Sequence, residues 1–334
     1  MSHGRFDNPV VASMAGFWDR FRKQELESHF TEKDRFDGKT VLVTGANSGL
    51  GFAISTEIAR RGGRVIMACR RQIPEAGEKV KAISGSENVE MRHLDLTRID
   101  SIHAFADGLV RDGIKLDVAV LNAGVTPPKA RRTQSGLDEM FLVNYLSNVM
   151  LTHLLISSGT INLNNDSAIF RPRIIFISSD SHQGSSYVDY DEFGRYFDYG
   201  VSKAIANYSY FKLVLNTYAT ELSKHINRDG IRAGIHVICP GPVNSNIVKE
   251  APLLLRLILK GIFTIIFKSP AKACKPVVYL AISPDFEGMT NEYLHMFRPK
   301  RMDPKVYLPE EGEKLWKRSL ELWQSVDPMA RIIP

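Results

Sequence analysis

A short apolar run followed at once by three closely spaced glycines constrains this chain more than any other feature. Residues 40–53 read Thr-Val-Leu-Val-Thr-Gly-Ala-Asn-Ser-Gly-Leu-Gly-Phe-Ala, which places Gly45, Gly49 and Gly51 where a buried strand gives way to a helix. Glycine permits a tight turn and lets the backbone approach a pyrophosphate, while the N–H groups at the helix N-terminus favour phosphate charge. The stretch predicts a strand, a nucleotide-binding turn and a helix.

Further apolar runs recur along the chain at spacings typical of alternating α/β proteins. Strands are expected at 64–69, 89–93, 116–121, 173–178 and 234–239, and more weakly at 291–297, with helical patterns between them. Parallel strands need a crossover of a dozen or so residues, and right-handed crossovers place helices on both faces of the sheet. We therefore predict an α/β fold, a single-domain doubly wound parallel sheet of about seven strands.

The fold is expected to fill residues 37–300, with an extension at each end. Residues 1–36 contain a predicted amphipathic helix whose apolar face carries Met14, Phe17, Trp18 and Phe21. A docked helix is favoured there over a membrane or partner contact. Residues 301–334 form the second extension, in which residues 309–323 predict a final amphipathic helix with Leu315, Trp316, Leu322 and Trp323.

Charge and cysteine content exclude several classes of function. The net charge of +6 comes from scattered basic residues rather than a basic stripe, so no nucleic-acid partner is expected. The three cysteines, Cys69, Cys239 and Cys274, are odd in number and two lie in apolar runs, which predicts free buried thiols in a reducing compartment. No apolar core of signal-peptide type follows the first residues, and the protein is expected to be cytoplasmic.

The spacing Thr44-Gly-x-x-x-Gly-x-Gly resembles the short-chain dehydrogenase/reductase family, whose single-domain Rossmann fold binds NAD or NADP. Further motifs follow in the family's order: Leu94-Asp95-Leu96, Asn122-Ala123-Gly124, a serine pair followed by Tyr-x-x-x-Lys, and Pro240-Gly241-x-Val243-x-Ser245. Together with Ala68-Cys69-Arg70, Val143-Asn144-Tyr145-Leu146 and Ser178-Ser179-Asp180-Ser181-His182, they resemble the retinol dehydrogenase-like branch. That branch also includes protochlorophyllide reductase and the WW-domain oxidoreductase and commonly handles lipophilic alcohols, aldehydes and ketones.

The second strand indicates which cofactor is used. Nineteen positions after Gly51, where an acidic residue would bind the ribose of NAD, the chain has Arg70 and Arg71, whose planar guanidinium groups suit a 2′-phosphate. NADP is therefore favoured. The resemblance implies no metal and a cofactor site made by Gly45, Asn47, Ser48, Gly49, Leu50, Gly51, Arg70, Arg71, Asp95, Leu96, Asn122, Ala123, Gly124, Tyr199, Lys203, Pro240, Gly241, Val243 and Ser245.

Two Tyr-x-x-x-Lys pairs follow the serine strand. A tyrosine transfers a proton near neutral pH only if its phenolate is stabilised, and a lysine one helical turn on supplies the positive charge. Tyr199 with Lys203 and Tyr208 with Lys212 both have this spacing, and the tyrosines lie nine residues apart, half a turn out of phase. We assign Tyr199 and Lys203, which directly follow the serine strand's loop. The resemblance adds Asn144 and Ser179 to the catalytic set.

Two inserts are expected to flank the substrate. The first, between Ser179 and Tyr199, carries Tyr187, Tyr190, Phe193, Tyr196 and Phe197. The second, a lid near 245–270, is richest in large apolar residues over 251–267. That segment is too short to cross a bilayer comfortably and has a polar stripe of Arg256, Lys260 and Thr264. A helix over the substrate pocket is the first choice, and an interfacial helix in peripheral contact with a membrane is the second.

These features predict an NADP-dependent oxidoreductase that interconverts a lipophilic alcohol and its aldehyde or ketone, with a retinoid, a steroid or a similar hydrophobic carbonyl as substrate. The alternative is a catalytically weak NADP-binding regulator, against which the retained Asn, Ser, Tyr and Lys set argues. An epimerase of the extended branch is disfavoured by the glycine spacing. Family members often form dimers through the helices after strands four and five, so a homodimer is considered, although the added termini would block such faces. The sequence does not identify the substrate or the direction of reaction.

Overall fold

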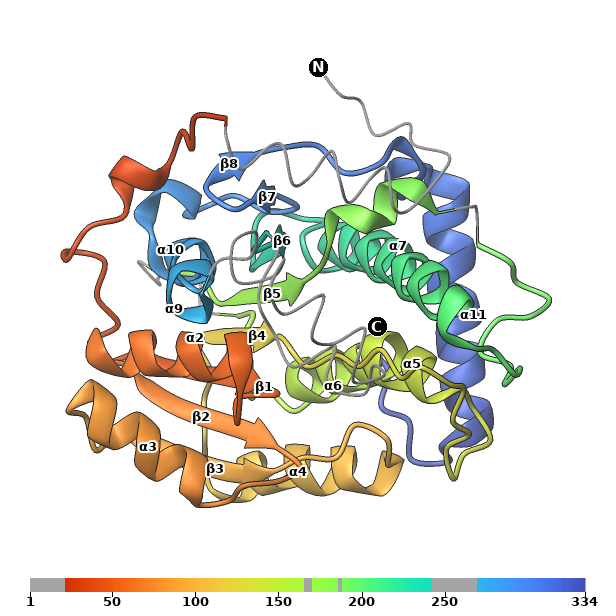
Figure 1. Cartoon of the computed structure of the whole chain (residues 1–334), viewed down its shortest axis with the longest axis horizontal. Coiled ribbons are helices and arrows are strands. Elements are labelled where there is room, and N and C mark those ends of the chain that lie inside the picture. The colour runs from red at the N-terminus through yellow and green to blue at the C-terminus, as the bar shows by residue number, and fades with distance from the viewer. Residues whose placement is uncertain (1–21, 165–169, 186–187, 242–268, 334) are drawn as a thin grey trace.

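Strands and helices alternate along the chain as predicted. The computed structural model describes residues 22–164, 170–185, 188–241 and 269–333, and in these ranges eight strands form one sheet (Figure 1). The strands are β1 (Thr40–Thr44), β2 (Arg64–Cys69), β3 (Val89–His93), β4 (Val118–Leu121), β5 (Arg173–Ile177), β6 (Gly234–Cys239), β7 (Tyr293–His295) and β8 (Arg298–Pro299). All neighbours pair parallel except β7 and β8. The α/β class and the doubly wound sheet are confirmed, and the short antiparallel β8 is an addition.

The strand order, β3-β2-β1-β4-β5-β6-β7-β8, reverses between β1 and β4. Crossover chains on the two sides of this point run to opposite faces, which leaves a crevice at the carboxyl ends of the strands. The helices are α2 (Gly49–Arg60), α3 (Glu75–Ser84), α4 (Ile99–Arg111), α5 (Glu139–Phe141), the π-helical η3 (Leu142–Leu146), α6 (Ser147–Ser157), α7 (Val201–Ile226), α9 (Pro270–Ala273), α10 (Lys275–Ile282) and α11 (Pro309–Val326), with short 3-10 turns η2 (Glu27–His29), η4 (Asp180–Gly184), η6 (Pro284–Phe286) and η7 (Pro304–Tyr307).

Each face of the sheet has its own hydrophobic core, because successive side chains of a strand point to opposite faces. In β1, Val41 and Val43 pack with α2, α3 and α10, whereas Leu42 packs with α4, α6 and α7. Burying one such side chain stabilises the fold by roughly 1.5–3 kcal/mol. Burial on both faces explains why the strands are near-continuous apolar runs rather than alternating ones.

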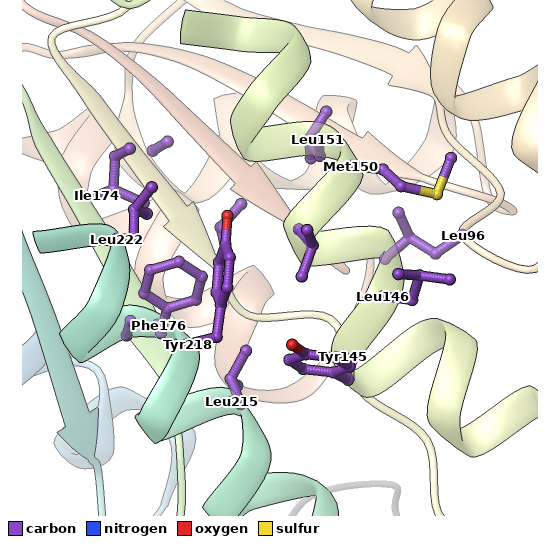
Figure 2. Close-up of a cluster of buried hydrophobic side chains, with 14 of the residues drawn as sticks. Leu96, Tyr145, Leu146, Met150, Leu151, Ile174, Phe176, Leu215, Tyr218 and Leu222 are labelled. Carbon is purple, nitrogen blue, oxygen red and sulfur yellow. The ribbon is translucent and has the colours of Figure 1, made fainter. Parts of the chain in front are cut away.

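The predicted C-terminal helix is confirmed as α11. It packs along α7 and contributes Leu315 and Trp323 to the core that contains Leu42. Trp323 is fully buried, and the Trp316 ring stacks on Tyr218 with ring centroids 5.7 Å apart. The hydroxyl of Tyr145 hydrogen-bonds Ser319 Oγ at 2.5 Å. Figure 2 shows a cluster of buried side chains from this core, which includes Leu96, Tyr145, Leu146, Met150, Leu151, Ile174, Phe176, Leu215, Tyr218 and Leu222.

Several further expectations are resolved by the described residues. Cys69, Cys239 and Cys274 are free and buried, as predicted. The helix expected around Phe17 and the lid near 245–270 lie outside the described residues. Within the described residues, one helical stretch, Glu139–Ser157, has the length and apolar composition to cross a membrane. Most of this stretch is buried in the core of the protein.

Candidate active site

A cleft of about 570 Å³ opens at the carboxyl ends of the central strands, where the strand order reverses. Every cofactor residue expected between Gly45 and Gly124 lines it, together with Ser179, Pro240 and Gly241. Two other expected cofactor residues, Val243 and Ser245, lie outside the described residues. The structure therefore brings most of the expected cofactor residues together in one cleft.

The glycine turn between β1 and α2 forms one wall of the cleft. Gly45 and Gly49 have φ values of +63° and +57°, a backbone conformation that L side chains rarely adopt. A Cβ at Gly51 would lie 2.4 Å from Gly45 O and 2.6 Å from Asn122 Nδ2. Because the turn leaves no room for a side chain, it forms a bare backbone cradle at the N-terminus of α2, which suits an anionic group.

Two arginines follow β2 at the far end of this wall. Both line the cleft and are exposed, and the Arg70 guanidinium lies 3.8 Å from the Asp95 carboxylate, with 41% of its side chain exposed. Asp95 also accepts hydrogen bonds from the backbone N–H and the hydroxyl of Thr97, at 3.0 and 2.7 Å. Asp95 thus stabilises the turn before α4 and orients Arg70 along the rim.

The Asn122-Ala123-Gly124 motif joins β4 to β1. Asn122 Nδ2 donates to Thr44 O at 2.9 Å, and the backbone N–H groups of Asn122 and Ala123 both donate to Thr44 Oγ1 at 3.0 Å. These bonds fix the ends of the two central strands at the point where the cleft opens. A Cβ at Gly124 would lie 3.3 Å from Asn144 Oδ1, so the chain passes close to the next helix here.

Asn144 lies at the centre of the π-helical segment η3, between α5 and α6. Its Nδ2 donates to Val125 O at 2.8 Å, and its Oδ1 accepts from Val125 N at 2.7 Å. Regular α-helical bonding is interrupted at this asparagine, and its side chain holds the loop that follows Gly124. Asn144 is fully buried behind this loop, whereas its neighbour Val143 lines the cleft.

The serine pair stands at the end of β5, on the floor of the cleft. Ser179 Oγ accepts a hydrogen bond from Ser181 N at 3.2 Å, which leaves its own proton available to a group in the cleft. Ser178 Oγ is buried without a hydrogen-bond partner among the described residues. Both side chains line the cleft next to Tyr208 and Lys212.

Tyr208 and Lys212, not Tyr199 and Lys203, are the tyrosine and lysine of the cleft. Lys212 is buried, its Nζ donates to Ile177 O at 2.7 Å, and it lies 5.4 Å from the centroid of the Tyr208 ring. Burial lowers the pKa of Lys212 to about 8 and raises that of Tyr208 above its usual range. The bond to Ile177, the last residue of β5, turns this face of α7 toward the serine pair.

The placement of Tyr199 and Lys203 expected from the sequence is therefore corrected. Tyr199 precedes the first residue of α7, and its carbonyl accepts from Ala130 N at 3.2 Å. Burial and then the nearby Asp138 raise the pKa of the Tyr199 phenol. Lys203 is exposed on the first turn of α7. The half-turn argument does not apply to Tyr199, which precedes the helix, and closeness to the serine strand selects a pair that does not line the cleft.

Contrary to expectation, the aromatic side chains of the insert that the structure describes do not line the cleft. Phe193 packs against Phe141 with ring centroids 5.1 Å apart, and the Tyr190 hydroxyl donates to Glu311 O at 3.1 Å. Tyr196 donates to Asp198, and Phe197 packs on the Tyr199 ring. Tyr187 lies outside the described residues. The insert is therefore anchored to α5 and α11 through Phe141 and Glu311.

Residues that sequence reasoning missed also line the cleft. Thr126, Pro127, Arg131, Glu139 and Val143 line it, and Arg131 Nη1 lies 3.5 Å from Glu139 Oε2. Thr126 and Pro127 follow β4 closely, which is the one signal in the sequence, whereas Glu139 and Val143 lie on α5 and η3. Cys239 also lines the cleft, and burial raises the pKa of its thiol to about 12, so it is not a thiolate.

Comparison with known proteins agrees with this geometry. The short chain dehydrogenase family model matches residues 39–189. Human retinol dehydrogenase 14 is 31% identical over 297 residues, 84% of each chain, and human retinol dehydrogenase 13 is 30% identical over 90% of this chain and 89% of its own. Human polyprenol dehydrogenase is 28% identical over 86% of both.

Solved structures share the fold at lower identity. An uncharacterised protein from Mycobacterium paratuberculosis superposes with a TM-score of 0.67 at 23% identity, covering 88% of this chain and 97% of that one. The Pseudomonas aeruginosa RhlG/NADP active-site complex gives 0.59 at 20% identity, over 80% and 98%.

Proposed function

We propose, on the premise that this chain belongs to the short-chain dehydrogenase family and to its retinol dehydrogenase-like branch, that it interconverts a lipophilic alcohol and its aldehyde or ketone with NADP. The family and its relatives make the protein an oxidoreductase acting on alcohol or carbonyl groups. The observation that supports the specific proposal is the Lys212–Ile177 hydrogen bond, because it brings a Tyr-x-x-x-Lys pair over the serines of β5.

The residues of the cleft fit a dinucleotide. The Cβ-free turn at Gly45 and Gly51 and the N-terminus of α2 suit a pyrophosphate, and Arg70 with Arg71 suits a 2′-phosphate. A bound nicotinamide would supply or accept the hydride. No acidic residue occupies the position after β2 that would favour NAD, which supports the choice of NADP.

Tyr208 is proposed as the group that exchanges a proton with the substrate oxygen. In the reducing direction its hydroxyl donates the proton, and in the oxidising direction its phenolate accepts one. Burial opposes the phenolate, so a neighbouring positive charge is needed. Lys212, with a pKa near 8, still carries that charge at neutral pH.

Ser179 and Asn144 are proposed to support this transfer. Ser179 Oγ already accepts from Ser181 N, so its proton is free to hold the substrate oxygen. Asn144 fixes the Val125 loop, which forms the opposite lip of the cleft. Tyr199 and Lys203, the pair first assigned from the sequence, are given no role here.

The substrate proposal rests on the relatives and on the cleft. Relatives of this chain are named for retinol and polyprenol, both lipophilic alcohols. Val125, Pro127 and Val143 give the described substrate end an apolar lining, and Arg131 and Glu139 add a polar rim. Peripheral membrane contact through residues 251–267 remains a proposal that concerns undescribed residues. A homodimer through α7 is disfavoured, because α11 packs along that helix.

The test is a pair of matched substitutions. Tyr208→Phe and Tyr199→Phe each remove one hydroxyl, and we assay both against a panel of all-trans-retinal, a polyprenal, a steroid ketone and benzaldehyde, following NADPH consumption. Tyr208→Phe should lower kcat by about 10² to 10⁴-fold with NADPH affinity kept, and Tyr199→Phe should leave it within a few fold. The reverse ranking would return the active site to Tyr199. A native chain that binds NADPH but converts none of these substrates would favour the alternative function, a catalytically weak NADP-binding regulator.

A further inference from the structure

The loop that carries Ser179 is held from behind by the C-terminal segment 293–303. His182 is fully buried on this loop, and its Nδ1 lies 2.7 Å from Ser179 O. The other ring nitrogen, Nε2, accepts a hydrogen bond from Asp303 N at 3.1 Å. Since a backbone N–H can only donate, Nε2 must be the acceptor and Nδ1 carries the proton given to Ser179 O.

A second set of contacts fixes the same loop at Asp180, the residue after Ser179. Asp180 is buried and accepts hydrogen bonds from Lys300 Nζ, at 2.5 Å, and from the Tyr293 hydroxyl. Its Oδ2 also lies 3.0 Å from His295 Nδ1. Burial by itself would raise the pKa of Asp180, but His295 and Lys300 hold it well below its usual range. The carboxylate is therefore charged and firmly held.

These contacts give His182 a defined tautomer and charge. Burial lowers its pKa and outweighs the nearby Asp180, so the ring is neutral near pH 7. The Tyr293 ring packs edge-on against it, with centroids 5.6 Å apart. A neutral ring with one donor and one acceptor, each used once, leaves little rotational freedom. His182 thus joins the backbone of Ser179 to the backbone of Asp303 across the rear of the cleft.

We propose that His182 is a positioning residue that sets the direction of the Ser179 hydroxyl. The Nδ1–H bond holds the Ser179 carbonyl away from the cleft, while the Ser181 N–H bond takes up a lone pair of Oγ. The remaining Ser179 O–H then points into the cleft as a donor to the substrate oxygen. This rests on the proposed function, because it matters only if Ser179 binds that oxygen.

Two substitutions separate the donor from the acceptor of the ring. His182→Asn places an amide near the position of Nδ1 and keeps the donor to Ser179 O, whereas His182→Gln places it near Nε2 and keeps the acceptor for Asp303 N. We expect His182→Gln to lower kcat by about 10 to 100-fold, since small misplacements of a reacting group have effects of this order. His182→Asn should stay within a few fold of the native chain, and NADPH affinity should be unchanged in both.

A double-mutant cycle with Ser179→Ala distinguishes positioning from a general structural role. If His182 acts through Ser179, the double variant Ser179→Ala with His182→Gln will be no slower than Ser179→Ala alone. Additive losses, or equal losses in the Asn and Gln variants, would overturn the proposal. A Ser179→Ala variant with native kcat would instead refute the role of Ser179 in the proposed function.

A readout that does not depend on turnover completes the test. Amide hydrogen exchange at residues 179–182 should rise in His182→Gln but not in His182→Asn, and equal exchange in the two would also overturn the proposal. His153→Gln, which alters another buried histidine on α6, controls for general destabilisation and should leave both kcat and exchange in this loop unchanged. Unfolding by urea confirms that each variant is folded under the assay conditions.

Discussion

Arg70→Ala tests the proposed preference for NADP most directly. The Arg70 side chain lies on the rim of the cleft and is 41% exposed, and its guanidinium lies 3.8 Å from the Asp95 carboxylate. An exposed pair at this distance contributes under about 1 kcal/mol, so little is lost when Arg70 turns from Asp95 to a phosphate. The side chain is therefore available to a 2′-phosphate at low cost.

The size of the effect follows from the kind of contact. A hydrogen bond to a charged group is worth about 1.5–3 kcal/mol, and the partial exposure of Arg70 favours the lower end. A loss of about 1.4 kcal/mol weakens binding tenfold. Arg70→Ala should therefore raise the Kd for NADPH about tenfold and the Kd for NADH less than about threefold, because only NADPH carries the phosphate.

The assay is a fluorescence titration of each cofactor into the native chain and the variants. Arg64→Ala is the matched control, because Arg64 begins the same strand, pairs with Glu90 at 3.1 Å and does not line the cleft. Its Kd values should equal those of the native chain. Equal native affinities for NADPH and NADH, or an equal loss of both in Arg70→Ala, would refute the reasoning.

Two further predictions concern the turn and the stability of the fold. Gly51→Ala should abolish measurable NADPH binding, because its Cβ would lie 2.4 Å from Gly45 O, whereas Gly108→Ala, with its nearest neighbour at 3.6 Å, should bind normally in the same titration. The second prediction is that stability falls in acid: burial lowers the pKa of His153 and His236 to about 3, so the unfolded chain takes up their protons first as the pH drops below about 6.5. Each histidine's contribution to the free energy of unfolding is fully present above pH 6.5 and should fall by about 2 kcal/mol between pH 7 and pH 5. Urea titrations should show a shallower pH dependence in His236→Leu. An unchanged slope in that variant would contradict the assignment.

The fold was largely predictable because the information needed for it is local. A strand buried on both faces must be a short apolar run. Position 51 must be glycine because a Cβ there would clash with the backbone of the turn after β1. Most of the expected cofactor residues directly follow strands, so parallel topology alone brings them together in the cleft. The antiparallel β8 was not foreseen, because two residues carry no periodic signal.

The end of the cleft near Arg131 and Glu139 was less predictable, because its arrangement depends on contacts between distant segments. The aromatic residues before α7 are as apolar as a substrate lid, and nothing in their order shows that Phe193 packs on Phe141 instead. The residues that do line this end, such as Arg131 and Glu139, belong to no motif. Likewise, the hydrogen bond from Asp303 N to His182 Nε2 joins residues 121 positions apart in the sequence.

The choice between the two Tyr-x-x-x-Lys pairs shows where sequence spacing stops being informative. Both pairs have the same spacing, on or just before one helix, so spacing alone makes them equivalent. The difference is burial: Lys203 is exposed, whereas Lys212 is buried and bonded to the last carbonyl of β5. A buried lysine is costly unless its charge is used, and here burial has lowered its pKa only to about 8. A charge retained beside a buried phenol is what a proton-transferring tyrosine requires, so the buried pair, rather than the pair nearer the serines in sequence, is the better candidate.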